Sequence, residues 1–144
     1  MGIAYRCDIE RGLSISVWHG ETTAEERREQ LTTLASDPDW AAGRLIVSDL
    51  TSVSSASGPG DGEIAETAAV FVERFAGAAL HAKWAIVADH AYEHAQAFGE
   101  QIEAAAPRVI VFNNLETGCA WLGVDAEVVR TIADDLRQEI RRSM

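Results

Sequence analysis

Apolar and polar residues alternate near the start of the chain. Between residues 13 and 18 every second position is apolar, which is typical of a strand with one buried face. Residues 3–10 precede this segment, and Arg11-Gly12 separates the two. The pattern therefore predicts a β-hairpin that ends at Gly20.

Three later segments are apolar without alternation. They are Leu45–Val47, Trp84–Ala88 and Val109–Phe112. A short continuous apolar run is typical of a strand that is covered on both faces. We therefore expect three more strands, buried within a sheet.

Helical signals occupy the segments between these strands. A capping box at Thr22 and Glu25 begins a helix that ends at Asp37-Pro38, because proline disfavours helical geometry in the residue before it. Ser52–Gly62 is rich in serine, glycine and proline and is predicted as a loop. Apolar positions at helical spacing predict two further helices: Ile64, Ala68, Phe71, Val72 and Phe75 in one, and Ala91, Ala95, Phe98 and Ile102 in the other.

Two helices are expected after the last strand. Leu115–Leu122 is followed by Gly123, a common residue at a helix C-terminus. From Asp125 onward apolar residues recur every four positions, which predicts a final amphipathic helix. These residues are Val128, Ile132, Leu136 and Ile140, with Val129 and Ala133 beside them. This helix is expected to pack on the same domain, and it is also a candidate dimerisation surface.

Alternating helices and strands predict an α/β fold. We expect a mixed, mostly parallel sheet of about five strands packed by helices, because parallel neighbours need helical crossovers. The 144 residues fit a single domain. Residues 1–123 would form its body, and residues 124–144 an extra C-terminal helix packed on it.

The charge balance narrows the classes of partner. The chain has 23 acidic and 12 basic residues, a net charge of -11, whereas nucleic acids and anionic membranes are bound by clustered Lys and Arg. No apolar run approaches the ~20 residues of a membrane-spanning helix. We also expect no signal peptide, because the charged residues Arg6 and Asp8 follow directly on Ile3-Ala4-Tyr5. Cys7 and Cys119 are too few for a disulfide scaffold. These features predict a cytoplasmic protein that binds no nucleic acid and spans no membrane.

Several short motifs resemble a known family. They are Asp37-Pro38-Asp39-Trp40, Asp49-Leu50, Ala85–Ala88, Val111-Phe112 and Ala120-Trp121-Leu122-Gly123. Together they resemble the SpoIIAA-like family, which is related to the STAS domains of sulfate transporters and anti-sigma-factor antagonists. That family also shares its architecture with the CRAL-TRIO lipid-transfer domains. The resemblance covers Ile3 to Gly123 and implies a STAS-like fold.

The resemblance also implies a place for a phosphorylation switch. STAS antagonists carry a phospho-accepting serine where the helix begins after the second buried strand, and here that position is Gly58, with Ser57 in place of an aspartate. The switch is therefore not intact. Three serines remain nearby, while two acids, Asp61 and Glu63, would repel a phosphate. The candidate switch or partner loop thus comprises Asp49, Ser54, Ser55, Ser57, Gly58 and Asp61, and the alternative is an ordinary polar loop.

One string matches a catalytic pattern. His90, Glu93 and His94 form the H-x-x-E-H arrangement of inverted zinc peptidases, in which two histidines one helical turn apart bind zinc and the glutamate is the base. No downstream acid lies in a motif that would supply a further ligand, so we favour a solvated helix face. Gly58–Gly62 lacks the Lys-Ser/Thr pair of a nucleotide loop. We therefore expect neither a metal nor a cofactor.

Four tryptophans are candidates for lining a ligand cavity, with a role in the core as the alternative. They are Trp18, Trp40, Trp84 and Trp121.

These observations favour a non-enzymatic function. We expect a small regulatory or protein-interaction module of the SpoIIAA-like kind, which binds a protein partner or itself. The alternative is a carrier or sensor of a small apolar or amphipathic ligand, as the CRAL-TRIO likeness implies. A third hypothesis is a metal-dependent hydrolase centred on His90, Glu93 and His94.

Overall fold

The structure is a computed structural model. It describes residues 2–20, 23, 25, 26, 29, 32, 33, 36–41, 45–53, 69, 83–89, 93, 96, 97, 100 and 108–143. These residues form an α/β fold built on one five-stranded sheet. Its strands are β1 Ile3–Asp8, β2 Leu13–Gly20, β3 Leu45–Val53, β4 Lys83–Val87 and β5 Arg108–Phe112. The helices with described bounds are α2 Pro38–Ala41, α5 Leu115–Leu122 and α6 Ala126–Arg142.

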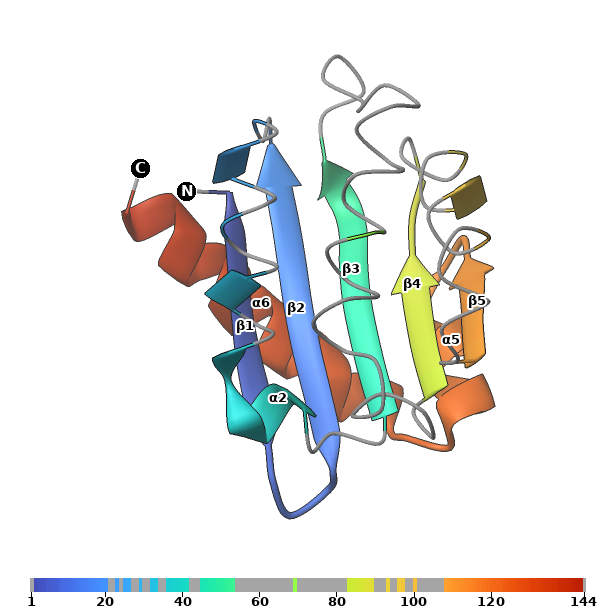
Figure 1. Ribbon diagram of the computed structural model, residues 1–144. Coiled ribbons are helices and arrows are strands. Elements are labelled where there is room, and N and C mark those ends of the chain that lie inside the picture. Colours follow the sequence, from blue (N-terminus) through green and yellow to red (C-terminus); the bar gives the residue numbers. More distant parts are fainter. Residues whose placement is uncertain are drawn as a thin grey trace.

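The strands lie side by side in the order in which they occur along the chain (Figure 1). β1 and β2 are antiparallel, and every later neighbour is parallel. The predicted mixed, mostly parallel sheet is therefore confirmed. Because β2 to β5 all run the same way, their carboxyl ends meet at a single edge of the sheet.

The N-terminal hairpin forms where the alternation predicts it. Its turn spans residues 9–12, and Gly12 takes a left-handed conformation with φ of 62° that a side chain would disfavour. The Gly12 N–H donates to the Ile9 carbonyl at 3.2 Å and closes the turn. β2 then continues to Gly20, as expected.

α5 and α6 cover one face of the sheet. α6 crosses β1 and β2, α5 packs on β4 and β5, and both helices lie behind the sheet in Figure 1. The core between helices and sheet is formed by Leu13, Ile15, Val17, Val47, Ala85, Val87, Cys119, Leu122, Val129, Ala133, Leu136 and Ile140. None of the described helices is long and apolar enough to cross a membrane.

The opposite face of the sheet carries a buried polar group. Ser16 and Ser48 lie on neighbouring strands with their Oγ atoms 2.8 Å apart, and the Trp84 indole N–H donates to the Ser48 Oγ at 3.0 Å. All three residues are almost fully shielded from solvent. A buried hydroxyl that lost its partners would be destabilising, so these bonds also fix how β2, β3 and β4 are aligned.

α2 lies on the side of the sheet away from α6 (Figure 1). It begins directly after Asp37, which is not helical, and the Asp39 N–H donates to the Asp37 Oδ1 at 2.9 Å. The predicted helix end at Asp37-Pro38 therefore marks the start of a new short helix as well, because proline is tolerated at the first helical position. The Tyr5 hydroxyl donates to the Asp37 Oδ2 at 2.7 Å and ties this segment to β1.

Candidate functional site

Several polar and charged side chains of the described residues lie at the carboxyl edge of the parallel strands. Ligands of open α/β proteins generally bind at this edge. Here β2 ends near His19, β3 near Ser52, β4 near Asp89 and β5 near Asn113. Among the described residues, this edge carries an ion pair at β3 and a hollow between β4 and β5.

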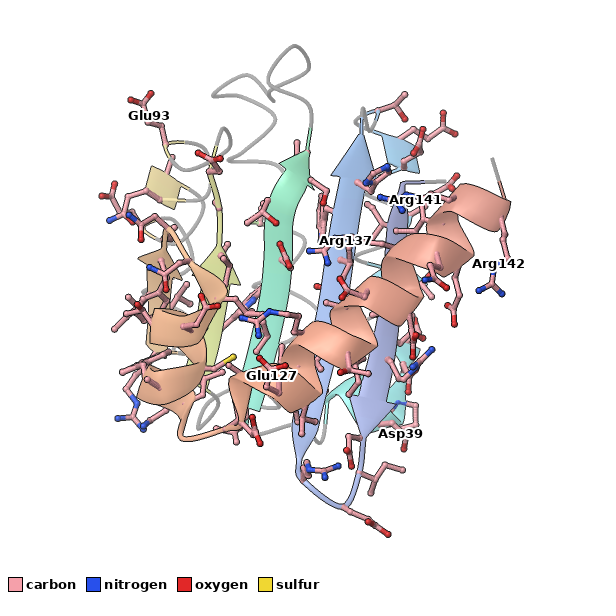
Figure 2. The ribbon with its side chains drawn as sticks, turned by 180° about the vertical axis from the view of Figure 1, so that it is seen from behind. Asp39, Glu93, Glu127, Arg137, Arg141 and Arg142 are labelled. Carbon is pink, nitrogen blue, oxygen red and sulfur yellow. The ribbon has the colours of Figure 1, made fainter. Side chains whose placement is uncertain are left out.

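The ion pair joins Asp49 of β3 to Arg137 of α6. The Asp49 side chain is 5% exposed and the Arg137 side chain 17% exposed, so both charges are largely removed from water. Arg137 extends from α6 toward the sheet, whereas Arg141 and Arg142 lie farther along the helix (Figure 2). A charge in such a position needs partners, because desolvation is costly for an unpaired ion.

Both residues of this pair have additional partners. The second Asp49 oxygen accepts from the Thr51 N–H at 2.9 Å and from the Thr51 hydroxyl at 2.6 Å. Arg137 also donates from Nε to the Ser52 Oγ at 3.0 Å and from Nη1 to Asp134 at 2.8 Å. The guanidinium is thus bound both to Ser52, near the C-terminal end of β3, and to Asp134 of its own helix.

A β-bulge in β3 brings Ser52 to this cluster. Val17 of β2 is opposite Asp49, but His19 is opposite Ser52. Between these two pairs β2 advances by two residues and β3 by three, so β3 contains one extra residue. The extra residue places Ser52 on the same face as Asp49, facing α6. Bulges are frequent next to functional sites because they redirect a side chain in this way.

His19 adds a titratable group to the same edge. Its ring is half-buried, and its Nδ1 atom is buried without a hydrogen-bond partner in the part of the chain that the structure describes. In the sequence His19 stands directly before Gly20, where the hairpin is predicted to end, and no neighbouring residue connects it with β3. The bulge places His19 opposite Ser52, and this pairing connects His19 with β3.

The hollow lies where β4 and β5 end. It has a volume of about 380 Å³, and its described lining consists of Ala88, Asp89, Val111, Phe112 and Asn113. The Ala88 N–H donates to the Phe112 carbonyl at 2.9 Å, and beyond this bond the chain turns away from β5 into α5. The volume falls within the range of small-molecule sites in proteins.

Most of the predicted switch or partner loop lies outside the described residues. This applies to Ser54, Ser55, Ser57, Gly58 and Asp61. Asp49 is described, and it is an ion-pair residue of the carboxyl edge, buried beneath α6. Ser52 and Val53 belong to β3 and not to the predicted loop, since β3 continues to pair with β2 as far as Val53.

The tryptophans whose side chains are described lie on both faces of the sheet. Trp84 faces Ser48 on one side of the sheet, while Trp121 packs on Phe112 at 5.8 Å between ring centres on the other side. The Lys83 ammonium lies 5.4 Å from the Trp121 ring centre, a cation–π contact. Trp18 is half-buried in β2, and the Trp40 side chain lies outside the described part. None of the four is a described lining residue of the hollow.

The residues of the zinc-peptidase pattern are described only in part. Glu93 is exposed, and Figure 2 shows it at a distance from α6, while His90 and His94 lie outside the described residues. Among the residues that the structure describes, no group of three or more His, Cys, Asp or Glu could hold a metal ion.

Neither cysteine is an activated nucleophile. Burial raises the pKa of the Cys119 thiol to about 11, and the Glu116 carboxylate adds to this shift. Burial also raises the pKa of the Cys7 thiol, which a hydrogen bond from Ser14 only partly offsets. Both thiols are therefore protonated at neutral pH, and a protonated thiol is a poor nucleophile.

Comparison with models of known protein families gives no match for this sequence, and comparison with curated proteins gives none either.

Proposed function

We propose that the protein is a regulatory module of the SpoIIAA-like kind, which binds a protein partner through the segment that leaves β3 at the carboxyl edge, residues 51–63. The observation that carries the proposal is the Asp49–Arg137 ion pair, with Ser52 bound to the same guanidinium. A partner that binds this segment and shifts its first residues also shifts Thr51 and Ser52. Thr51 is bound to Asp49, and Ser52 is bound to Arg137. Binding at the edge is therefore transmitted to α6, a helix that covers the sheet.

The test is co-purification from the cells that make the protein. The loop variant replaces Ser54, Ser55 and Ser57 by alanine, and the matched control replaces Ser143, an exposed serine after α6. A partner that is retained by the wild-type protein and by S143A but lost by the loop variant supports the proposal. A partner that the loop variant retains equally well contradicts it.

Phosphorylation of the loop is tested on the same material. A denaturing mass spectrum of the purified protein would show an added phosphate, because the modification is covalent. Loss of that mass in the loop variant alone would locate it at one of the three serines.

The hollow favours a second candidate function, a carrier or sensor of a small ligand. A volume of about 380 Å³ with both apolar and polar lining residues suits a small amphipathic molecule. Native and denaturing mass spectra of gently purified protein would reveal a bound molecule as a mass present only in the native spectrum. N113W, which fills the hollow, should remove it, whereas E116W on the exposed side of α5 should not.

A further inference from the structure

β5 is the last strand of the sheet, and no strand in the described part of the chain pairs with its outer edge. An edge strand presents unpaired N–H and C=O groups that can bind a further strand. Figure 1 shows β5 at the side of the sheet, opposite the edge formed by β1.

The hydrogen bonds between β4 and β5 reveal which backbone groups are available. The Phe112 carbonyl accepts from the Ala88 N–H, so the polar groups of Phe112 point toward β4. These groups alternate between the two sides of a strand, so those of Arg108 and Ile110 also point toward β4. Val109 and Val111 therefore direct their N–H and C=O groups away from the sheet.

The side chains of β5 differ from the rest of the described surface in hydrophobicity and in charge. Ile110 is 42% exposed, and among the described residues only Ile9, in the hairpin turn, is another large exposed hydrophobic residue. In a protein with a net charge of -11, β5 contains no acid and one cation, Arg108. Two copies of this acidic chain would therefore meet here with little local repulsion.

We propose that the protein forms a twofold dimer in which β5 of one copy pairs antiparallel with β5 of a second copy, with Ile110 on the twofold axis. Val109 of each copy lies opposite Val111 of the other, and the outward N–H and C=O groups of both residues form hydrogen bonds. The two five-stranded sheets then become one continuous sheet.

In this register the five residues of β5, Arg108–Phe112, are complementary to the same residues of the second copy. The two Ile110 side chains form a pair without backbone hydrogen bonds, the kind of pair in which opposite side chains lie closest. Arg108 of each copy lies opposite Phe112 of the other, on the same face of the sheet, where a guanidinium and an aromatic ring attract one another. This self-complementarity favours a second copy over an unrelated strand.

The opposite edge of the sheet is less suitable. β1 carries Arg6 and Asp8, and Arg6 is bound to Glu139 of α6 at 2.7 Å. Charged side chains on an edge strand oppose pairing with another chain. The dimer is therefore expected through β5 alone.

The test is the molar mass in solution, measured by light scattering during size-exclusion chromatography at about 1 to 500 μM protein. The wild-type protein should reach twice its 15.6 kDa as the concentration rises. I110K places two cations on the axis, and V109P removes an outward N–H without removing a hydrogen bond to β4. Both variants should stay monomeric, and the matched control I9K should dimerise like the wild type.

A second measurement needs no variant. In hydrogen exchange, the Val109 and Val111 amides should be protected at high concentration and exposed on dilution, whereas the Ile110 and Phe112 amides should be protected at both. A wild-type protein that stays monomeric at the highest concentration overturns the proposal. So does a dimer that persists in folded I110K and V109P, or Val109 and Val111 protection that does not change on dilution.

Discussion

Arg137 of α6 and Asp49 of β3 form an ion pair across 88 residues of sequence, in a place where both side chains are largely shielded from water. This contact links the middle of a central strand to the helix that covers the neighbouring strands β1 and β2. Its energetic effect depends on both partners being present, because either charge alone would be buried without compensation.

Removing one partner of this pair should therefore be strongly destabilising. We expect R137M or D49A to lower the free energy of unfolding by about 3–5 kcal/mol, as measured by urea denaturation. The double variant should lose less than the sum of the two, because it leaves no unpaired charge. R142M, which alters an exposed arginine on the same helix, should change stability by less than about 0.5 kcal/mol. Equal, small effects of R137M and R142M would show that the pair contributes little.

The buried indole on the other face offers a separate test. W84F removes the hydrogen bond to Ser48 while keeping an aromatic ring, and should cost about 1–3 kcal/mol, since a buried polar group then loses a partner. W121F removes a half-buried indole that forms no hydrogen bond with the described residues, and should cost less. Urea unfolding compares the two variants directly. A larger loss in W121F would argue against a structural role for the serine–tryptophan group.

Tyr5 should titrate at unusually high pH. Its hydrogen bond to Asp37 and its burial raise the pKa of the phenol from 10.0 to about 12. The folded protein therefore holds this proton more tightly than the unfolded chain. The contribution to stability is complete below pH 10 and is lost as the pH rises from 10 through 12. The difference between the alkaline ultraviolet titrations of wild type and Y5F isolates Tyr5, and D37N should move its midpoint back toward 10.

Thiol labelling should distinguish the two cysteines. Cys119 is buried with a pKa of about 11, so a disulfide reagent at pH 8 should leave it unmodified in the folded protein. Cys7 is half-buried in β1 and should react, though slowly, because burial raises its pKa as well. Both thiols should react fully after unfolding in guanidinium chloride. Rapid labelling of Cys119 in C7A would mean that α5 opens readily from the sheet.

Most of the fold that the structure describes could be predicted from local patterns. The N-terminal hairpin, the three apolar strands and the helix closed by Gly123 follow from alternation, continuous runs and a left-handed glycine with φ of 76°. These signals depend only on neighbouring residues. In α6 the buried stripe differs from the predicted one. Val129 and Ala133 are fully buried, whereas Val128 and Ile132 are only partly buried, at the margin of the stripe. A spacing of four drifts around a helix of 3.6 residues per turn.

The site was harder to predict because it depends on tertiary contacts. In the sequence Asp49 is an acid close to the apolar run Leu45–Val47, but no neighbouring residue identifies Arg137 as its partner. A cation in the last turns of a helix is already accounted for by the helix dipole, so Arg137 carries no local sign of a buried partner. A signal did exist, since Arg137 lies four residues after Ala133 and therefore beside the buried stripe. The bulge that brings Ser52 to the same cluster follows only from the pairing of β3 with β2.

The contact between α6 and the hairpin has a consequence for how this protein is made. Arg6 of β1 is bound to Glu139, and Leu13, Ile15 and Val17 are covered by a helix that leaves the ribosome more than a hundred residues later. During synthesis the apolar face of the hairpin is therefore not yet covered by α6. Apolar strands that are exposed at this stage are prone to aggregation. A nascent chain stalled before α6 should depend on chaperones far more than the completed one.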